Sequence, residues 1–180
     1  MAWVAHDASP VAWSLVQRVA ALVGLPSTHA ENMQVIRYES GQQYRQHWDA
    51  YDHDTERGAR VMKDGGNRLI TVLGYLNEVE RGGQTEIVNP AIFVDPLPGR
   101  LLIFHNCYAG TATRHPDSLH AGLAVKAGTK WAFNLWFRER PTSWGLAAAQ
   151  RSAWPTRPPR TRSSPRPRAR ASPSSTATSE

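Results

Sequence analysis

The chain of 180 residues contains a single cysteine, Cys107, so no disulfide can form within it. It also lacks any run of 18 or more apolar residues, which is the usual signature of a transmembrane helix. The first residues, 1–7, do not combine a basic segment with an apolar stretch, so no secretory signal is expected. Together these absences favour a cytoplasmic location and no membrane partner.

A surplus of positive charge is missing from most of the chain. The formal net charge is +6, but seven of the 21 basic residues and one of the 15 acidic residues lie in 151–180, so 1–150 carry 14 of each. A nucleic-acid-binding domain carries its basic patch on the folded surface, and this distribution argues against one. An Arg-rich tail that tethers the protein to nucleic acid or another polyanion remains as an alternative.

Large apolar residues are missing from the end of the chain. Residues 155–180 consist almost entirely of Pro, Arg, Ser, Thr and Ala, and the pattern of apolar positions ends near residue 141. Such a segment cannot bury enough surface to offset the entropy of ordering it. We therefore predict one domain over 1–140 and a disordered Pro/Arg/Ser-rich tail over 141–180.

One helix is expected near the N-terminus. Ser9 is suited to the N-cap, Pro10 to the first helical position, and Gly24 to the end of the helix. Apolar residues recur at a spacing near 3.6 and predict the face that packs on the core. They are Val11, Leu15, Val19, Leu22 and Val23.

Most of the remaining sequence alternates between strand-like segments and turns. The predicted strands are 33–39, 43–49, 67–76, 85–88, 100–104, 119–125 and 130–138. The segments 50–66 and 105–118 are polar and predict loops. Short strands with few helices indicate a mainly β fold with a packing helix, either a jelly-roll or a small barrel.

The strands 119–125 and 130–138 are predicted to form a hairpin with a turn at 126–129. Alternation along the second strand separates two faces. One face is apolar and carries Trp131, Phe133, Leu135 and Phe137. The other would line a ligand cavity and carries Lys130, Ala132, Asn134, Trp136 and Arg138.

His47 and Asp49 form a His-x-Asp pair in an extended segment, so both side chains point to the same side of the strand. With His120 from another strand they would give two imidazoles and one carboxylate, the ligand set of non-haem Fe(II) oxygenases.

The second such pair, His115 and Asp117, lies in a predicted loop with only His120 after it. Taken alone, a His-x-Asp pair is more often a solvated surface pair. The histidines assigned to the surface or to loops are His53, His105 and His115.

Lys130 lies on the face of 130–138 that is predicted to line the cavity. A lysine in such a place requires an anionic partner, because burying an unpaired charge is costly. Beside an iron site it would serve as the counter-ion of a dicarboxylate. The alternative is a turn lysine that reaches solvent.

Three segments, 37–49, 68–85 and 120–139, occur in the order and spacing of a known family. They contain Arg-Tyr-Glu-Ser-Gly-Gln-Gln-Tyr-Arg-Gln-His-Trp-Asp, the run from Arg-Leu-Ile-Thr-Val to Gly-Gly-Gln-Thr, and His-Ala-Gly followed by Lys-Trp and Trp-Phe-Arg-Glu. They resemble the catalytic domain of the prolyl 4-hydroxylase alpha subunits, which are 2-oxoglutarate- and Fe(II)-dependent dioxygenases. The resemblance covers about residues 30–140, the core of the predicted domain.

The resemblance implies a fold and a set of ligands. The fold is a double-stranded β-helix of the cupin-like jelly-roll type, shortened at its N-terminus because Met1 falls almost directly at the packing helix. The implied iron ligands are His47, Asp49 and His120. Lys130 would hold the distal carboxylate of 2-oxoglutarate, and the residues implied to position this cosubstrate are Tyr38 and Thr85.

The resemblance also implies an activity. O2 and 2-oxoglutarate would be consumed, succinate and CO2 released, and a substrate C–H bond hydroxylated, with C4 of a peptidyl proline as the expected position and ascorbate as the reductant that rescues oxidised iron. The implied substrate-side residues are Tyr44, Arg68 and Trp136, and the partner would be a proline-containing peptide or protein. The alternatives are a hydroxylase of a free amino acid or small molecule, and an inactive metal-binding β-barrel homologue.

Overall fold

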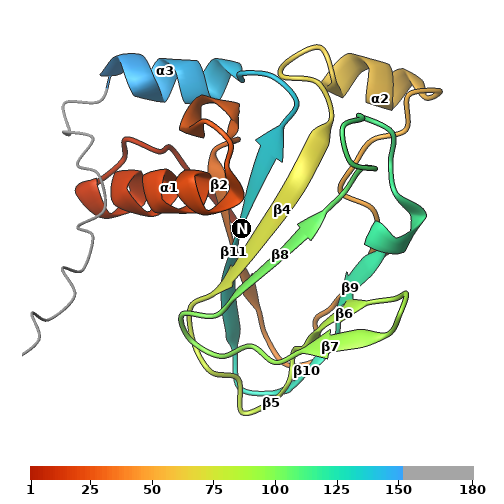
Figure 1. Cartoon of the computed structure of the whole chain (residues 1–180). Helices are drawn as coiled ribbons and strands as arrows, with labels where there is room; N and C mark the ends of the chain where they lie inside the picture. Colours follow the sequence, from red (N-terminus) through yellow and green to blue (C-terminus); the bar gives the residue numbers. More distant parts are fainter. Residues whose placement is uncertain (152–180) are drawn as a thin grey trace, which may run out of the picture.

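The computed structural model describes residues 1–151, which form two β-sheets facing each other with helices on the outer side of one of them (Figure 1). The larger sheet has the strand order β1 (Ala2–Val4), β2 (Met33–Tyr38), β11 (Lys130–Arg138), β4 (Arg68–Tyr75) and β8 (Leu101–His105). The smaller sheet has the order β3 (Tyr44–His47), β9 (His120–Gly122), β6 (Thr85–Ile87) and β7 (Ile92–Val94). A short pair, β5 (Arg81–Gly82) and β10 (Val125–Ala127), lies at one end.

The predicted N-terminal helix is confirmed as α1 (Pro10–Val23). The Ser9 hydroxyl accepts a hydrogen bond of 3.1 Å from the amide of Ala12, and Gly24 ends the helix with φ of 72°. A residue with a side chain would be strained at that backbone angle, so glycine suits the position. Both ends of the helix, at Ser9 and at Gly24, are therefore where the sequence predicted them.

The predicted buried face of α1 is wrong in part. Val11 is 77% exposed and Leu22 is 62% exposed, although both belong to the predicted stripe. The buried residues of the helix are Ala12, Trp13, Val16, Val19 and Ala20. The helix turns two alanines toward the sheet because small side chains allow its backbone to approach the strands closely.

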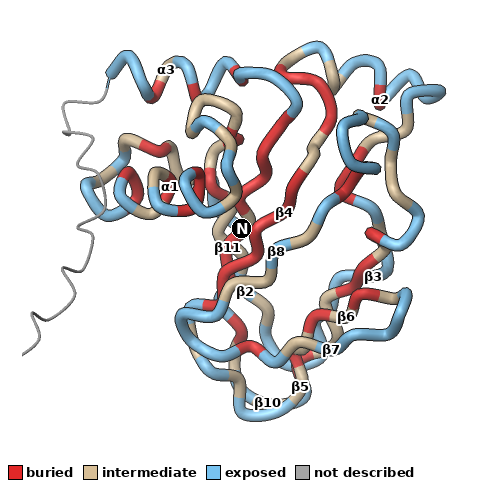
Figure 2. Tube along the Cα trace, in the orientation of Figure 1, coloured by how far each residue is buried: buried red, intermediate tan, exposed pale blue. Residues whose placement is uncertain are grey.

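The main core lies between α1 and the outer face of the larger sheet. Phe133, Leu135 and Phe137 of β11 are buried there with Val72 of β4, as the alternation predicted. Trp131 was assigned to the same face but is 42% exposed, because it lies beyond the part of the strand that the helix covers. Figure 2 shows buried residues concentrated in the central strands and on the inner side of α1.

The predicted hairpin between 119–125 and 130–138 is wrong. β9 pairs with β3 and β6 in the smaller sheet, whereas β11 pairs with β2 and β4 in the larger one. Between them β10 pairs with β5. The chain thus crosses from one sheet to the other between consecutive strands, which is the connectivity of the predicted jelly-roll and brings both sheets to one cavity.

Several elements were not predicted from the sequence. β1 precedes the first helix and pairs with β2. Short 3-10 turns occur at Ser27–His29 (η1) and Pro116–Ser118 (η2). The helix α2 (Glu56–Val61) interrupts the predicted loop over 50–66, with the Thr55 hydroxyl accepting a hydrogen bond from the amide of Gly58.

The boundary predicted at residue 140 is also corrected. The helix α3 (Ser143–Arg151) lies in the segment assigned to the disordered tail and packs on η1. Gly145 allows the helix backbone to lie against Thr28, because a Cβ atom at this position would meet the Thr28 carbonyl oxygen. The rest of the predicted tail, 152–180, lies outside the described residues.

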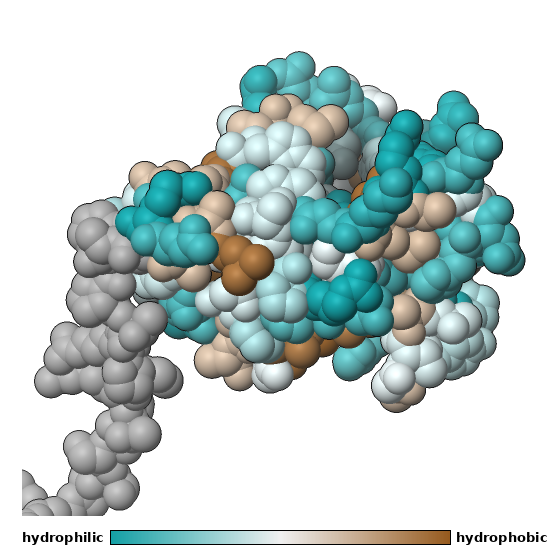
Figure 3. Space-filling view, turned by 90° about the horizontal axis from the view of Figure 1, so that it is seen from above, coloured by the Kyte–Doolittle hydropathy of each residue, from teal (hydrophilic) through white to brown (hydrophobic). Residues whose placement is uncertain are grey.

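The outer surface near α2 and α3 is mainly polar, with small scattered apolar patches (Figure 3). Over residues 1–151 no helix has the length and apolar character needed to cross a membrane.

Candidate metal centre

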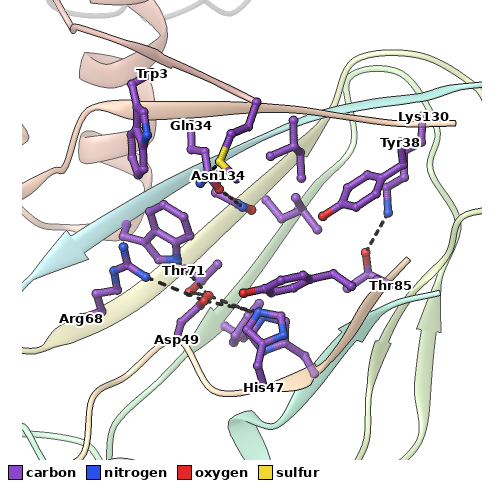
Figure 4. Close-up of a pocket in the computed structure, with 18 of the residues that line it drawn as sticks. Trp3, Gln34, Tyr38, His47, Asp49, Arg68, Thr71, Thr85, Lys130 and Asn134 are labelled. Carbon is purple, nitrogen blue, oxygen red and sulfur yellow. Dashed lines mark hydrogen bonds and ion pairs between the residues drawn. The ribbon is translucent and has the colours of Figure 1, made fainter. Parts of the chain in front are cut away.

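A cavity of about 490 Å³ lies between the two sheets, within the range of small-molecule sites (Figure 4). Residues of both sheets line it, so the cavity depends on the chain segments that cross from one sheet to the other. The lining includes all nine residues that the sequence assigned to the site: Tyr38, Tyr44, His47, Asp49, Arg68, Thr85, His120, Lys130 and Trp136.

His47, Asp49 and His120 meet at one wall of this cavity. His47 ends β3 and His120 begins β9, and the two residues are direct partners across the antiparallel pair. Asp49 follows His47 by two residues, and one ligand atom from each of the three lies within 4.8 Å of the others. The structure therefore brings together the cluster that the sequence predicted, although its second histidine comes from a neighbouring strand rather than from a hairpin with β11.

Both imidazoles are oriented by backbone carbonyl groups. The Nδ1 atom of His47 lies 2.8 Å from the carbonyl oxygen of Arg45, and Nδ1 of His120 lies 2.9 Å from that of Ser118. A carbonyl oxygen only accepts, so each Nδ1 carries a proton, and in the neutral imidazole the Nε2 lone pair is then the one that can bind a metal. The two Nε2 atoms lie 3.6 Å and 3.5 Å from Asp49 carboxylate oxygens, an arrangement that suits a shared cation.

Asp49 is 6% exposed but remains an anion. Burial raises the pKa of its carboxyl group, yet His120, Arg68 and hydrogen bonds from Thr71 and Trp136 lower it more, and the pKa lies below its usual value. Burial, followed by the nearby His120, lowers the pKa of His47. A neutral imidazole and an ionised carboxylate are the protonation states that bind metal.

Arg68 lies beside this cluster and is held by an acid that the sequence analysis missed. Its guanidinium group donates two hydrogen bonds, of 2.7 Å and 2.8 Å, to the buried Glu31 carboxylate. It also lies over the Trp136 ring at 3.7 Å, and its Nη1 atom is 4.0 Å from Asp49. Arg68 is therefore fixed in place before any substrate binds.

Two residues of β11 predicted to line the cavity do not do so. Arg138 is fully buried beyond the cavity, where it pairs with Glu31 and donates to the carbonyl oxygens of three residues near α2. Ala132 packs against Leu73 and Tyr75 instead. The alternation itself is confirmed, because Lys130 and Trp136 from the same face do line the cavity.

The other end of the cavity is built around Lys130, which is 3% exposed. Its ammonium group donates to the carbonyl oxygen of Gly83 at 2.6 Å and lies 3.5 Å from the Thr85 hydroxyl, with the Tyr38 ring 5.9 Å away. Burial lowers the pKa of Lys130 to about 8. The inward position is thus confirmed, and the alternative of a lysine that reaches solvent is wrong.

Tyr75 joins this group and was missed because it lies in an apolar strand. Its hydroxyl donates to the Thr85 hydroxyl at 2.8 Å, and burial raises its pKa to about 12, so it stays protonated. A buried cation flanked by hydroxyl groups, with no carboxylate among its hydrogen-bond partners in the described chain, suits one end of an anionic ligand.

The remaining predicted residues lie near the entrance or elsewhere. Tyr44 is 53% exposed, and its ring packs against that of His47 at 4.1 Å. The second His-x-Asp pair lies at the start of η2, where His115 is the N-cap and its Nδ1 atom accepts a hydrogen bond from the amide of Asp117. Within residues 1–151 the only cluster suited to a metal is therefore the one predicted.

Comparisons with known proteins agree with this geometry. A sequence model of the 2OG-Fe(II) oxygenase superfamily matches residues 33–138. A protein of Acanthamoeba polyphaga mimivirus that carries the name prolyl 4-hydroxylase is 34% identical over 141 residues, covering 78% of this chain and 58% of its own. The rat prolyl 4-hydroxylase subunit alpha-3 is 35% identical over 141 residues, which cover 77% of this chain and 25% of the subunit.

The fold has a solved counterpart as well. The crystal structure of a viral collagen prolyl hydroxylase from Paramecium bursaria Chlorella virus-1, in complex with 2-oxoglutarate, superimposes with a TM-score of 0.64. The two chains are 27% identical, and the match covers 76% of this chain and 77% of the viral one. The described chain thus shares the double-stranded β-helix, although it spans little more than half of the mimivirus relative.

Proposed function

This chain belongs to the 2OG-Fe(II) oxygenase superfamily, and we propose that it is a peptidyl-proline 4-hydroxylase. Membership of that superfamily implies Fe(II) and 2-oxoglutarate as cofactor and cosubstrate. The observation that carries the proposal is the facing pair of sites in one cavity: a His/Asp/His cluster at one wall and a buried lysine at the other end. The prolyl substrate is inferred from the names of the similar proteins.

We assign His47, Asp49 and His120 as the Fe(II) ligands. Two neutral imidazoles and one carboxylate match the nitrogen and oxygen donors that non-haem Fe(II) prefers, and they leave three coordination positions open. The bound metal supplies the activation of O2 that the side chains alone do not provide. The protein's part is to hold both Nε2 atoms and the carboxylate in place through the Arg45 and Ser118 carbonyl groups and the donors to Asp49.

We assign Lys130 as the partner of the distal carboxylate of 2-oxoglutarate, with Thr85 and Tyr38 beside it. The ammonium group already lies within 3.5 Å of the Thr85 hydroxyl, so both donors face one small volume. Tyr75 orients that hydroxyl from behind. The keto-acid end of the same molecule would then lie toward the metal cluster, since both ends of the cavity belong to one enclosure.

Tyr44, Arg68 and Trp136 are assigned to the substrate side. Tyr44 is exposed at the cavity entrance, where its ring is available to a prolyl residue. Arg68 and Trp136 are bound to Glu31 and Asp49, so they shape the wall rather than move with the substrate. Ascorbate is proposed as the reductant that returns oxidised iron to Fe(II).

Hydroxylation of a free amino acid is the second candidate, and one residue favours it. The Arg57 side chain lines the cavity and has no hydrogen-bond or ion-pair partner within residues 1–151. A cation at that position would suit the carboxylate of a free amino acid. Arg68 cannot take this role, because Glu31 already occupies its guanidinium group.

The test is a turnover assay with Fe(II), 2-oxoglutarate and ascorbate. Proline-rich peptides should raise succinate formation above the rate without substrate, and each succinate should be matched by one hydroxyproline found by mass spectrometry. Stimulation by free proline but by no peptide would support the second candidate. Protein that binds Fe(II) but consumes no 2-oxoglutarate would identify an inactive homologue instead.

A further inference from the structure

The two carboxylate oxygens of Asp49 have different surroundings. Oδ2 accepts a hydrogen bond of 2.7 Å from the Thr71 hydroxyl and one of 2.8 Å from the Trp136 indole nitrogen. Oδ1 accepts none from residues 1–151, and its nearest charged neighbour is Arg68 Nη1 at 4.0 Å. The two imidazoles do not distinguish the oxygens, because His47 Nε2 lies 3.6 Å from Oδ1 and His120 Nε2 lies 3.5 Å from Oδ2. A carboxylate oxygen offers about two lone pairs, so those of Oδ2 are both engaged while those of Oδ1 are free.

The direction of the Thr71 hydroxyl is set by a buried amide. The Nδ2 atom of Asn106 donates to the Thr71 oxygen at 2.8 Å. Because a hydroxyl has one proton, and because this oxygen already accepts from Asn106, its proton is directed to Asp49. The opposite amide orientation would place two acceptors, Asn106 and Asp49, in competition for that single proton.

Thr71 lies within the larger sheet and Asn106 just beyond one of its strands, whereas Asp49 follows a strand of the smaller sheet. Thr71 on β4 is the register partner of Trp136 on β11, so both donors to Oδ2 come from adjacent strands. Asn106 directly follows β8, the next strand along. Asp49 is therefore held from the opposite sheet, and its carboxylate cannot turn without breaking this contact.

The backbone of Asn106 acts on the second histidine as well. Its carbonyl oxygen accepts a hydrogen bond of 2.8 Å from the His115 amide. The His115 carbonyl oxygen accepts one of 2.7 Å from the Ser118 hydroxyl. The carbonyl group of Ser118 in turn orients His120 through Nδ1. The side chain of Asn106 is thus linked to Asp49, and its backbone is linked to His120.

We propose that Asn106 and Thr71 form a positioning relay that makes Asp49 a ligand through Oδ1 alone. The inference rests on the proposed function and adds two residues that would act on the metal through Asp49. A carboxylate that turned and bound through both oxygens would occupy one of the three open positions. The relay therefore keeps those positions available for 2-oxoglutarate and O2.

The buried carbonyl oxygen of the Asn106 side chain is consistent with this role. It has no hydrogen-bond partner among the described residues. Leaving a buried acceptor unpaired is unfavourable, so an apolar residue would fill this space at a lower cost in stability. What an apolar residue would lack is the Nδ2 donor to Thr71.

The test measures metal binding rather than turnover, with Co(II) as the probe under anaerobic conditions. Thr71→Val and Asn106→Leu should each weaken Co(II) binding roughly 10- to 100-fold, the range typical of groups that support metal ligands. Thr71→Ser keeps the hydroxyl and should restore both the affinity and the ligand-field absorption spectrum. In the double variant the two losses should not multiply, because Asn106 acts on Asp49 only through Thr71.

Thr142→Val is the matched control. Thr142 is also fully buried, and its hydroxyl donates to the Ala30 carbonyl oxygen away from the cavity. This variant should lower the unfolding temperature while leaving Co(II) affinity and spectrum unchanged. If Thr71→Val does not fold, Trp136→Phe removes the other donor to Oδ2, keeps an aromatic ring beside Arg68, and should weaken Co(II) binding in the same way.

Two results would overturn the relay. One is wild-type affinity and spectrum in Thr71→Val and Asn106→Leu, and the other is a double variant whose loss is the product of the single losses. Wild-type protein that binds no Co(II) or Fe(II) is a different result, because it contradicts the proposed function itself.

Discussion

At the scale of single residues, the three proposed ligands have no substitutes within the described chain. Replacing His47, Asp49 or His120 with alanine should abolish metal retention and reduce succinate formation to the level without protein, because two donors cannot hold the metal. Metal content per chain and a succinate assay measure the two effects. His53→Ala is the matched control, since His53 is exposed and bonds only a loop carbonyl group. Full metal content in any of the three variants would contradict the assignment.

Lys130 should affect the cosubstrate and not the metal. Truncating one member of a buried, hydrogen-bonded charge pair costs about 2–5 kcal/mol. Lys130→Ala should therefore raise the KM for 2-oxoglutarate by roughly thirtyfold or more, with metal content unchanged. Steady-state kinetics and metal analysis of the same preparation separate these effects. A variant that loses metal but keeps its KM for 2-oxoglutarate would show that Lys130 supports the metal site and not the cosubstrate.

The same lysine predicts a pH dependence. Burial lowers the pKa of Lys130 to about 8, so the ammonium form that pairs with a carboxylate dominates below that pH and is lost above it. The carboxylates of 2-oxoglutarate stay ionised throughout. The KM for 2-oxoglutarate should be constant from pH 6.5 to 7.5 and rise by up to tenfold per unit above about 8. Lys130→Arg remains charged in this range, and its KM should show no such rise.

Some of these residues were accessible from the sequence because they form patterns. His47 and Asp49 share a strand face by their spacing, and Lys130 follows from the alternation of β11. Thr71 and Asn106 show no such pattern, since one is a lone polar residue in an apolar strand and the other lies in a loop. Their role depends on which strands are neighbours, which spacing along the chain does not encode.

At the scale of elements, the helix α3 should stabilise the fold without contributing to the site. Gly145→Ala would place a Cβ atom against the Thr28 carbonyl oxygen. Overpacking of this kind costs about 1–3 kcal/mol, or roughly 2–4 °C of unfolding temperature for each kcal/mol in a domain of this size. Calorimetry should show the loss, and Co(II) affinity should not change.

Leu146→Ala in the same helix is the control for that experiment. Leu146 is exposed, and alanine favours a helix as much as leucine does, so the unfolding temperature should stay near that of the wild type. A change in Co(II) affinity in Gly145→Ala would show that α3 is coupled to the cavity after all.

The sequence predicted which segments are strands better than it predicted their partners. The strands 130–138 and 67–76 were located correctly because their apolar residues are β-branched, aromatic or alternating. The pairing of 119–125 with 130–138 was wrong, since a short turn suggests a hairpin even where the chain crosses between sheets. The face of α1 was misjudged for a related reason: apolarity alone ranks Leu22 above Ala20, whereas close packing on a sheet selects the smaller residue.

At the scale of the whole molecule, the candidate site joins the two sheets. His47 and His120 belong to the smaller sheet, and Lys130 belongs to the larger one. A molecule of 2-oxoglutarate held by the metal at one end and by Lys130 at the other would therefore span the gap between them. The core between α1 and the larger sheet does not supply this link, because it lies on the outer face of that sheet.

This arrangement predicts strong stabilisation of the fold by its ligands. A ligand that binds only the folded state at 100 times its dissociation constant adds about 2.7 kcal/mol, which corresponds to roughly 5–11 °C in a domain of this size. Mn(II) with 2-oxoglutarate should raise the unfolding temperature by about that amount. Mn(II) alone should raise it less, because the binding energy of the cosubstrate at Lys130 is then missing. Glutarate lacks the keto group that would reach the metal, so it should add little to the rise in unfolding temperature that Mn(II) produces.

Lys130→Ala should lose the rise in unfolding temperature due to 2-oxoglutarate but keep the rise due to Mn(II). An equal increment in Lys130→Ala and wild type would show that the cosubstrate does not bridge the two sheets.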